Sequence, residues 1–304
     1  MSLSDILLQQ LANGLILGSF YALVALGYTM VYGIIKLLNF AHGDIYMVGA
    51  FAGFAVLSLV SGLFGAGWLG IVTAMLVSMA AVGALGVLIE RVAYRPLRNA
   101  PRLSILITAL AVSMVLSNGA LSLTGGQYTA FNTDLGFAGF DIADVHVTWT
   151  QLILVAASLA LMLAMQVFVS RTMYGKAMRA IAIDQDACRL MGIDVDKVVA
   201  LTFFIGSALA AASGVMAGVY YGSIYYFMGF LIGLKAFTAA VIGGIGSIPG
   251  AMLGGLALGL LEAFGTQIPA IGSEWKDVFV FAILILLLVF KPTGLLGRPE
   301  VERM

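Results

Sequence analysis

Positions 171–197 read RTMYGKAMRAIAIDQDACRLMGIDVDK, and this stretch decides the fold. Five of its 27 residues are basic and four are acidic, whereas the flanking stretches 145–170 and 198–234 contain no Asp, Glu, Lys or Arg. A segment this rich in charge cannot lie in hydrocarbon. It therefore predicts a loop in water between two membrane spans, and its basic residues near the span ends place that loop in the cytoplasm.

The loop has a helical pattern of its own. Its apolar stripe, interrupted at the polar positions 184–186, consists of Met178, Ile181, Ile183, Cys188, Leu190 and Met191. Such a stripe predicts a short amphipathic helix that fits an apolar groove on another protein. Cys188 is the only cysteine, which excludes an intrachain disulfide, and we interpret it as a small buried apolar residue rather than a reactive thiol.

Composition extends the membrane assignment to the whole chain. Of the 304 residues, 62% are hydrophobic and only 10% are charged, with a mean hydropathy of +1.07. Soluble domains contain roughly 45–50% apolar and 25% charged residues. We therefore predict an all-α, polytopic helical membrane protein embedded in a lipid bilayer, with residues 1–304 forming one transmembrane domain. The formal net charge is zero, which gives no reason to expect a nucleic-acid partner.

Uncharged runs give the number of spans. We expect nine, within a range of eight to ten that depends on whether the first segment is broken and whether the polar segment 36–44 re-enters the membrane. The spans are 6–35, two within 45–89, and then 103–123, 149–170, 198–220, 230–247, 251–266 and 277–291. The N-terminus lacks the basic region of a signal peptide and leads into a longer apolar run, so the first span should be retained.

The basic residues orient these spans. Threading the chain with its N-terminus outside places 13 of the 15 Lys and Arg residues on the inner side. The basic segment 90–102, the loop 171–197 and the C-terminal tail 291–304 are then cytoplasmic, and the loops 124–148 and 266–276 lie outside.

The sequence also contains an internal similarity. Residues 31–51 resemble residues 220–237, with a Tyr-Gly pair, further glycines and Ala-Phe in common. This similarity predicts inverted half-repeats of about 8–124 and 198–291.

Catalytic signatures do not appear. The sequence has no G-x-x-x-x-G-K-[ST] phosphate loop and no G-x-S-x-G elbow. Two histidines, His42 and His146, cannot build a metal cluster with the single cysteine. We expect no enzymatic activity, no catalytic residue, no metal and no cofactor, so any ATP must be bound by a partner.

Two charges fall inside predicted spans. Lys235 and Glu262 lie at matching depths below the outer ends of neighbouring spans, and an unpaired charge there costs several kcal/mol. We predict an ion pair between them. A second interpretation is that they line the transport route and bind the two ends of a zwitterionic solute.

Other candidates for a path or gate are polar or small. Many glycines recur at spacing four: Gly214, Gly218 and Gly222; Gly246, Gly250 and Gly254; Gly255 and Gly259. They favour tight helix packing, while the turn 243–250 with Gly246 and Ser247 is also a candidate inner gate. In segment 36–44, Asn39 is expected to end one helix and Asp44 to begin the next. His42 is a hydrogen-bonding residue or, alternatively, a proton carrier.

Long blocks of the sequence carry a family resemblance. They are YALVALGYTMVYGIIKLLNFAHGD, IERVAYRPLR, GKAMRA, DACRLMGI, KAFTAAVIGGIGSIPGAMLGG and PTGLLGRPEVE. From about residue 13 to the C-terminus the chain resembles the H-type permease subunit of the bacterial high-affinity branched-chain amino-acid ABC importers. The resemblance implies a multi-pass protein of the bacterial inner membrane that translocates Leu, Ile and Val. The implied partners are a second homologous permease, two cytoplasmic ATPases and a periplasmic solute-binding protein.

The resemblance also gives the loop 171–197 a role. Permeases of ABC importers carry an E-A-A-x-x-x-G coupling motif, and Asp186, Ala187, Cys188 and Gly192 are similar to it, with a shorter acid and one alanine replaced. The family thus implies ATPase coupling at these four positions. The alternative is an ion-coupled secondary amino-acid carrier or channel that uses Lys235 and Glu262 and needs no ATPase. A structural scaffold is a poor fit to so many intramembrane glycines.

Overall fold

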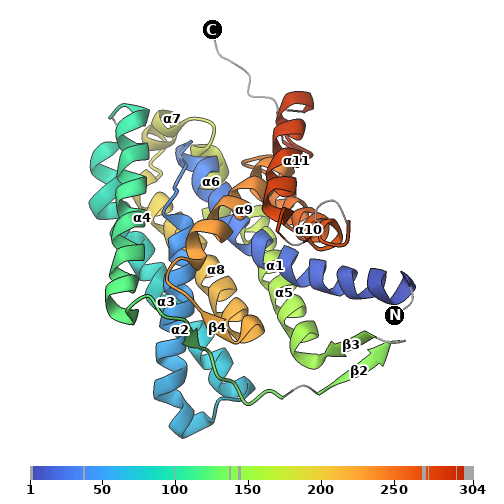
Figure 1. The fold of residues 1–304 in the computed structure, drawn as a ribbon. Coiled ribbons are helices and arrows are strands. Elements are labelled where there is room, and N and C mark those ends of the chain that lie inside the picture. Colours follow the sequence, from blue (N-terminus) through green and yellow to red (C-terminus); the bar gives the residue numbers. More distant parts are fainter. Residues whose placement is uncertain are drawn as a thin grey trace.

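The computed structural model describes residues 3–36, 38–98, 100–136, 138–142, 145–268, 272, 274–291 and 293–297. Figure 1 shows a bundle of helices with short strands at one end. The helices are α1 (Leu3–Ile35), α2 (His42–Phe64), α3 (Trp68–Ile89), α4 (Arg102–Thr124), α5 (Trp149–Arg171), α6 (Met173–Ile181), α7 (Gln185–Leu190), α8 (Val195–Tyr221), α9 (Met228–Gly243), α10 (Ile248–Gly265) and α11 (Lys276–Phe290). The strands are β1 (Thr129–Ala130), β2 (Gly139–Ile142), β3 (Val145–Thr148) and β4 (Ser223–Ile224).

Long apolar helices dominate the described chain. Seven of them are long and apolar enough to cross a membrane: α1, α2, α3, α4, α5, α8 and α10. Helices α9 and α11, with 16 and 15 residues, occupy the other two predicted spans. The predicted polytopic helical membrane architecture is confirmed, because continuous apolar runs of about 20 residues specify helices of membrane length. Part of the predicted outer loop 266–276 and the end of the tail, with Arg298 and Arg303, lie outside the described residues.

Helices α1 and α8 form the centre of the bundle. Within the most apolar 18-residue stretch of each helix, 89% of α1 and 78% of α8 is buried inside the protein, compared with 11% of α4. Helix α1 packs along α10, α8 and α9, while α8 packs along α2 and α3. Helix α4 therefore presents its apolar side chains outward, as a lipid-facing helix does.

Glycines let these central helices approach backbone to backbone. A methyl group added at Gly259 would lie 2.2 Å from the backbone nitrogen of Gly18, and one added at Gly255 would lie 2.4 Å from the backbone of Ala22. Contacts of this kind confirm the predicted tight packing at Gly214, Gly250, Gly254, Gly255 and Gly259, whereas at Gly218 the nearest atoms belong to the side chains of Phe131 and Ile224. The packing prediction is wrong for Gly222 and Gly246. These two have φ of +66° and +92° with no neighbour within 4 Å, so they serve turns instead.

Gly259→Ala is expected to loosen the α1–α10 contact. Both sides of the contact are backbone, so the overlap can be relieved only by moving a helix, which costs about 1–3 kcal/mol. We expect a lower midpoint of thermal unfolding in detergent. The matched control is Gly119→Ala in α4, where a methyl group meets nothing within 4 Å. Alanine there should keep or raise stability, since it gains about 0.5–1 kcal/mol over glycine in a helix. Equal shifts for the two variants would contradict the packing argument.

The contacts of the first helices recur in the later ones. Helix α1 packs along α10 and α8 packs along α3, while α2 contacts α8 and α9 contacts α1. Two halves related by a two-fold axis in the membrane plane give such a reciprocal pattern. The half-repeats 8–124 and 198–291 stay a prediction, and this packing is compatible with it.

The polar segment 36–44 forms a break between α1 and α2. The prediction that Asn39 ends a helix is wrong, because α1 already ends at Ile35. Asn39 instead leads into α2, since its side-chain Oδ1 accepts a hydrogen bond from the Ala41 N–H at 3.1 Å. Asp44 lies in the first turn of α2, as expected, where a carboxylate favours the positive end of the helix.

The segments predicted to be cytoplasmic gather at one end of the molecule. Helices α6 and α7 lie at the end of α5 opposite to β2 and β3 (Figure 1). The residues after α11 return to the α9–α10 turn, where Leu295 N–H donates to Ile242 O at 2.8 Å and Leu296 N–H to Gly243 O at 3.0 Å. The segment 90–102 is more helical than predicted, because a π-helical turn over 90–94 and a 3-10 turn over 95–97 continue α3.

Candidate functional site

The predicted coupling segment folds as two short helices rather than one. Asp184 separates them, because its carboxylate accepts the backbone N–H groups of Asp186 at 3.0 Å and Ala187 at 2.9 Å and so begins α7. Gly192 ends α7 as predicted. It adopts φ +81°, and the next N–H, of Ile193, donates to Cys188 O at 3.0 Å.

The apolar side chains of this segment face two ways: some point into the bundle and others are exposed. Met178, Ile181 and Cys188 are buried, which confirms the prediction that the cysteine is a small buried residue. By contrast, the exposed trio consists of Ile183, Leu190 and Met191, whose exposed fractions are 76%, 90% and 80%. The prediction of one amphipathic helix with a single apolar face is therefore wrong, because the chain turns at Asp184. One set of residues holds α6 and α7 to the bundle and the other is open to a partner.

Of the four positions matched to the coupling motif, Asp186, Ala187 and Gly192 are exposed. The Asp186 carboxylate forms an exposed pair with Arg189 at 3.2 Å. Cys188 points inward, so it stabilises α7 rather than facing a partner. The assignment of these residues to ATPase coupling stays a prediction.

Helix α7 is connected to the centre of the bundle. The side chain of Gln185 donates from Nε2 to the backbone oxygen of Ile34, near the end of α1, at 3.1 Å. On the other side, Asp194 begins α8 by accepting the Lys197 N–H at 3.1 Å, and its carboxylate pairs with Lys197 Nζ at 2.9 Å. These bonds from Lys197 lower the pKa of Asp194, which keeps the carboxylate ionised at neutral pH.

Charged residues tie the end of α3 to the start of α8. Arg98 binds the Asp196 carboxylate at 2.5 Å and also binds Glu90, which is 1% exposed, while Arg95 binds Asp196 as well. From sequence, the segment 90–102 is interpreted only as a basic loop. In the structure its arginines hold the start of α8, the helix that follows the coupling segment, against the end of α3.

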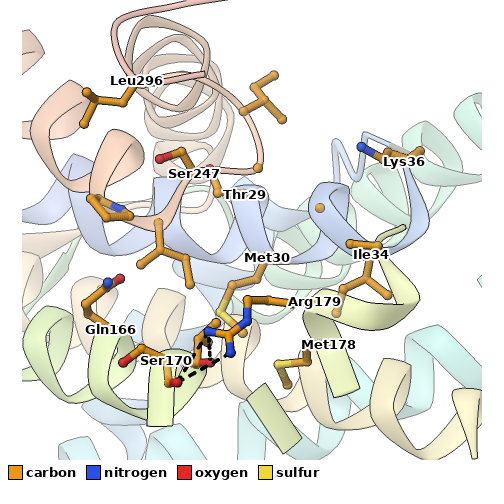
Figure 2. A pocket seen from close by; sticks show the side chains of 17 residues that line it. Thr29, Met30, Ile34, Lys36, Gln166, Ser170, Met178, Arg179, Ser247 and Leu296 are labelled. Carbon is orange, nitrogen blue, oxygen red and sulfur yellow. Dashed lines mark hydrogen bonds between the residues drawn. The ribbon is translucent and has the colours of Figure 1, made fainter. Parts of the chain in front are cut away.

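A cavity of about 560 Å³ lies beside the coupling helices. Its walls come from α1, the end of α5, α6, the α9–α10 turn and the residues after α11 (Figure 2). Arg179 on α6 lies in one wall, where its Nη1 donates to Val169 O at 2.9 Å. Gly246 and Ser247 lie in another, and the Ser247 Oγ begins α10 by accepting the Gly250 N–H at 3.2 Å. The two predicted gate residues of the turn therefore face a cavity, although their function as a gate stays a prediction.

The predicted ion pair between Lys235 and Glu262 is confirmed. Lys235 Nζ lies 2.7 Å from Glu262 Oε1, and both side chains are nearly buried, at 6% and 3% exposed. The pair belongs to a larger buried charge network. Lys235 also lies 2.7 Å from Asp277 Oδ1, Tyr21 donates its hydroxyl to Glu262 Oε2 at 2.8 Å, and Lys276 lies 3.6 Å from Glu262.

This buried charge network joins α1, α9, α10 and α11. Its two lysines and two carboxylates balance in charge, which removes most of the cost of burial in a membrane. Neither Lys235 nor Glu262 lines the 560 Å³ cavity. The alternative role of the pair in binding a zwitterionic solute has no test in these contacts and stays a prediction.

Asn39 lies in the break between α1 and α2, His42 is the first residue of α2, and neither lines the cavity. Asn39 is buried and accepts the Tyr94 hydroxyl at 2.6 Å. His42 is also buried, with its ring edge-on to Tyr28 at 4.8 Å between centroids. A methyl group at Gly27 would lie 2.1 Å from His42 Nε2, so the imidazole fills the space that this glycine leaves. Their assignment to the translocation path stays a prediction.

Sequence reasoning missed several residues of these sites. Arg179 and Gln166 line the cavity, yet they come from different helices and no motif joins them. Tyr21 reaches Glu262 across 241 positions. Asp277 belongs to a predicted span end, and its closeness to Lys235 follows only from the packing of α11 against α9.

Comparison with known proteins identifies the family of this chain. Residues 10–288 match the family model described as branched-chain amino acid transport system / permease component. The chain is 47% identical to the high-affinity branched-chain amino acid transport system permease protein BraD of Pseudomonas aeruginosa, over 98% of both chains. It is 46% identical to the corresponding permease protein LivH of Escherichia coli, over 98% of this chain and 97% of the relative. A probable branched-chain amino acid transport permease protein LivH of Methanocaldococcus jannaschii is 29% identical over 94% of this chain and 91% of the relative.

Proposed function

The chain belongs to the permease components of branched-chain amino acid transport systems, and from this premise we propose that it is the membrane-spanning subunit of an ATP-driven importer in the bacterial inner membrane. Its solutes are leucine, isoleucine and valine, delivered by a periplasmic binding protein. Its partners are a second similar permease and two cytoplasmic ATPases. The chain itself is not an enzyme. The observation that carries the proposal is the exposed trio, which lies just before α7 and at its end, beside a cavity at the same end of the bundle.

The proposed orientation puts α6, α7 and the C-terminus in the cytoplasm. Its support is the excess of Lys and Arg in the segments that meet at this end, since basic residues are retained on the inner side. The loops around 124–148 and 266–276 then face the periplasm, where a binding protein docks. Strand β1 pairs with β4, with Thr129 opposite Ile224, so the first of these loops is fastened to the α8–α9 connection.

The mechanism follows from how α6 and α7 are attached. An ATPase that binds the exposed trio moves α6 and α7. The buried side chains of Cys188, Met178 and Ile181 attach these helices to the bundle, so the motion is passed on to it. Met178 and Arg179 are part of the cavity wall, so the same motion changes the inner cavity. Helices α5 and α8 flank the coupling segment and transmit the motion toward the outer side. In this mechanism the permease alternates between an outward-open and an inward-open state. The solute shifts that equilibrium only by the difference between its affinities for the two states, so tight binding by the permease is not needed.

Gln185 should act as a mechanical link between α7 and α1. Gln185→Leu and the nearly isosteric Gln185→Glu both remove the donor to Ile34 O, a bond worth about 1 kcal/mol. We expect normal assembly with the ATPases but a severalfold lower number of leucine molecules moved per ATP hydrolysed, measured in proteoliposomes. The control is Gln9→Leu, since Gln9 is exposed near the start of α1 and belongs to neither the coupling segment nor the proposed docking loops. Unchanged coupling in both Gln185 variants would contradict this link.

The energy source tests the proposed function. Proteoliposomes that contain the chain with its permease and ATPase partners should accumulate labelled leucine when ATP is inside and the binding protein outside. A proton gradient without ATP should give no accumulation. The opposite result would favour an ion-coupled carrier that uses Lys235 and Glu262. The buried charge network gives no specific support to that alternative, because its lysines and carboxylates already form ion pairs with one another.

A further inference from the structure

The inner cavity has a chemical character that the transport cycle alone does not require. Seven of its wall residues are large and apolar: Met30, Ile34, Val169, Met178, Ile245, Ile248 and Leu296. Its charged wall residues are the cations Lys36 and Arg179, and no Asp or Glu lines the part that the structure describes. Such a cavity attracts an anion that carries an aliphatic group and disfavours a free cation.

Groups whose chemistry suits a carboxylate lie in two different walls. Arg179 has five N–H donors, and the bonds it makes to the backbone oxygens of Val169 and Ser170 hold the guanidinium in place at the cavity edge (Figure 2). Ser247 lies at the start of the 18-residue helix α10, where a hydroxyl can donate and the helix dipole favours negative charge. Gln166 on α5 adds an amide to the same cavity.

The size of the cavity fits a small solute. At about 560 Å³ it is within the range of 300–1,000 Å³ typical of small-molecule sites. A branched aliphatic group can contact the apolar wall while its carboxylate lies beside Arg179 or Ser247, with space left for water. Arg179 belongs to α6, so an occupied cavity resists the motion of the coupling helices.

We propose that this cavity is a cytoplasm-facing binding site for small branched aliphatic carboxylates, including the transported amino acid, and that its occupation slows transport. This inference rests on the proposed function, because it uses the same coupling helices and the same orientation. Solute that accumulates inside then limits further import, with Arg179 and Ser247 binding the carboxylate and the apolar wall binding the branched side chain.

The test uses the assembled importer in proteoliposomes with ATP inside and the binding protein and labelled leucine outside. The lumen is preloaded with 4-methylpentanoate, which keeps the carboxylate and branched chain of leucine but lacks the amine. Acetate controls for a permeant weak acid, and 3-methylbutylamine keeps the branched chain without the carboxylate. We expect severalfold slower initial uptake with 4-methylpentanoate alone. Equal effects of all three, or no effect of 4-methylpentanoate, would overturn the proposal.

Variants assign the effect to the cavity. Arg179→Gln should raise the concentration of 4-methylpentanoate needed for half-inhibition by about tenfold, the effect of losing one charged hydrogen bond. Gln166→Glu, which adds a negative charge with little change in volume, should do the same if Arg179→Gln fails to assemble. The control is Arg91→Gln, the same change of charge at an exposed site outside the cavity. Full inhibition in both cavity variants would contradict the assignment.

A binding measurement separates this inference from the proposed function. Saturation-transfer NMR on the full-length chain in lipid nanodiscs should detect 4-methylpentanoate but not 3-methylbutylamine, whether or not ATP drives uptake. Failure of ATP-driven uptake in the wild type would refute the proposed function. Normal ATP-driven uptake with no binding of 4-methylpentanoate would refute only the cavity site.

Discussion

Replacing both Leu190 and Met191 by aspartate is expected to abolish ATP-driven uptake and the co-purification of ATPase subunits, while membrane insertion stays normal. The two side chains are 90% and 80% exposed, so the change removes little packing within the chain. Burying a Leu or Met side chain in a partner groove contributes about 1.5–3 kcal/mol each. Losing both, and placing two carboxylates in an apolar groove, should weaken association by about a hundredfold or more. The measurement is the amount of ATPase recovered with the affinity-tagged permease.

The control for this prediction is the double change Leu63→Asp with Phe64→Asp. These side chains are also exposed, at 81% and 48%, but they end α2 at the opposite side of the predicted membrane. The control should retain full ATPase recovery. Deletion of residues 184–192, which removes α7 and the residues that cap it, should match the aspartate variant. Normal ATPase recovery with either would remove the physical basis of the coupling assignment.

Lys235→Met is expected to cause the largest loss of stability. The change leaves Glu262, at 3% exposed, and Asp277 without their shared ammonium, and the remaining cation, Lys276, is farther from Glu262, at 3.6 Å, and 41% exposed. Removing one partner of a buried ion pair costs about 3–5 kcal/mol. A domain is stable by only about 5–15 kcal/mol. We expect strongly reduced yield of folded protein and a lower midpoint of thermal unfolding, followed by size-exclusion chromatography of a fluorescent fusion.

Two further variants separate charge from volume in this network. Lys235→Met combined with Glu262→Gln removes both charges, and it should recover a large part of the lost stability, because an amide is cheaper to bury than an unpaired carboxylate. Lys276→Gln should cost less than about 1 kcal/mol, since Lys276 is 41% exposed and its pair is screened by water. If all three variants are equally unstable, the loss reflects packing and not charge.

Much of the fold could be predicted from sequence, because a membrane restricts the possibilities. Uncharged runs of helix length gave the helices near their observed positions, and equal depth below the outer ends brought Lys235 and Glu262 together. Depth could not show that Tyr21 and Asp277 join them. That contact depends on which faces of α1 and α11 turn toward α9 and α10, and apolar side chains on every face leave that rotation undetermined.

The coupling segment shows a different limit. Its apolar residues follow a helical period that is interrupted at positions 184–186, but the interruption alone does not show that Asp184 caps a second helix, α7. Local hydrogen bonding of an aspartate competes with helix continuation, and spacing alone does not reveal it. Sequence therefore identified the segment, Gly192 and the burial of Cys188, whereas the division into two helices and the exposed trio required the structure.

The cavity could be anticipated only in part. The glycine-rich turn with Gly246 and Ser247 was visible as a departure from helix-forming sequence, and both residues line the cavity. Arg179, Gln166 and Leu296 come from three other parts of the chain. Their meeting depends on the residues after α11 folding back onto the α9–α10 turn, a tertiary contact made by backbone groups that carry no sequence pattern.

Cross-linking from position 191 tests the central claim most directly. Met191→Cys introduces an exposed thiol next to the buried Cys188, so the wild type serves as the unreactive control. In native membranes the account predicts a covalent product between this variant and an ATPase subunit after treatment with a bifunctional thiol- and amine-reactive reagent. It also predicts no labelling of intact cells by an impermeant maleimide. Labelling from the periplasmic side, without the ATPase product, would contradict it.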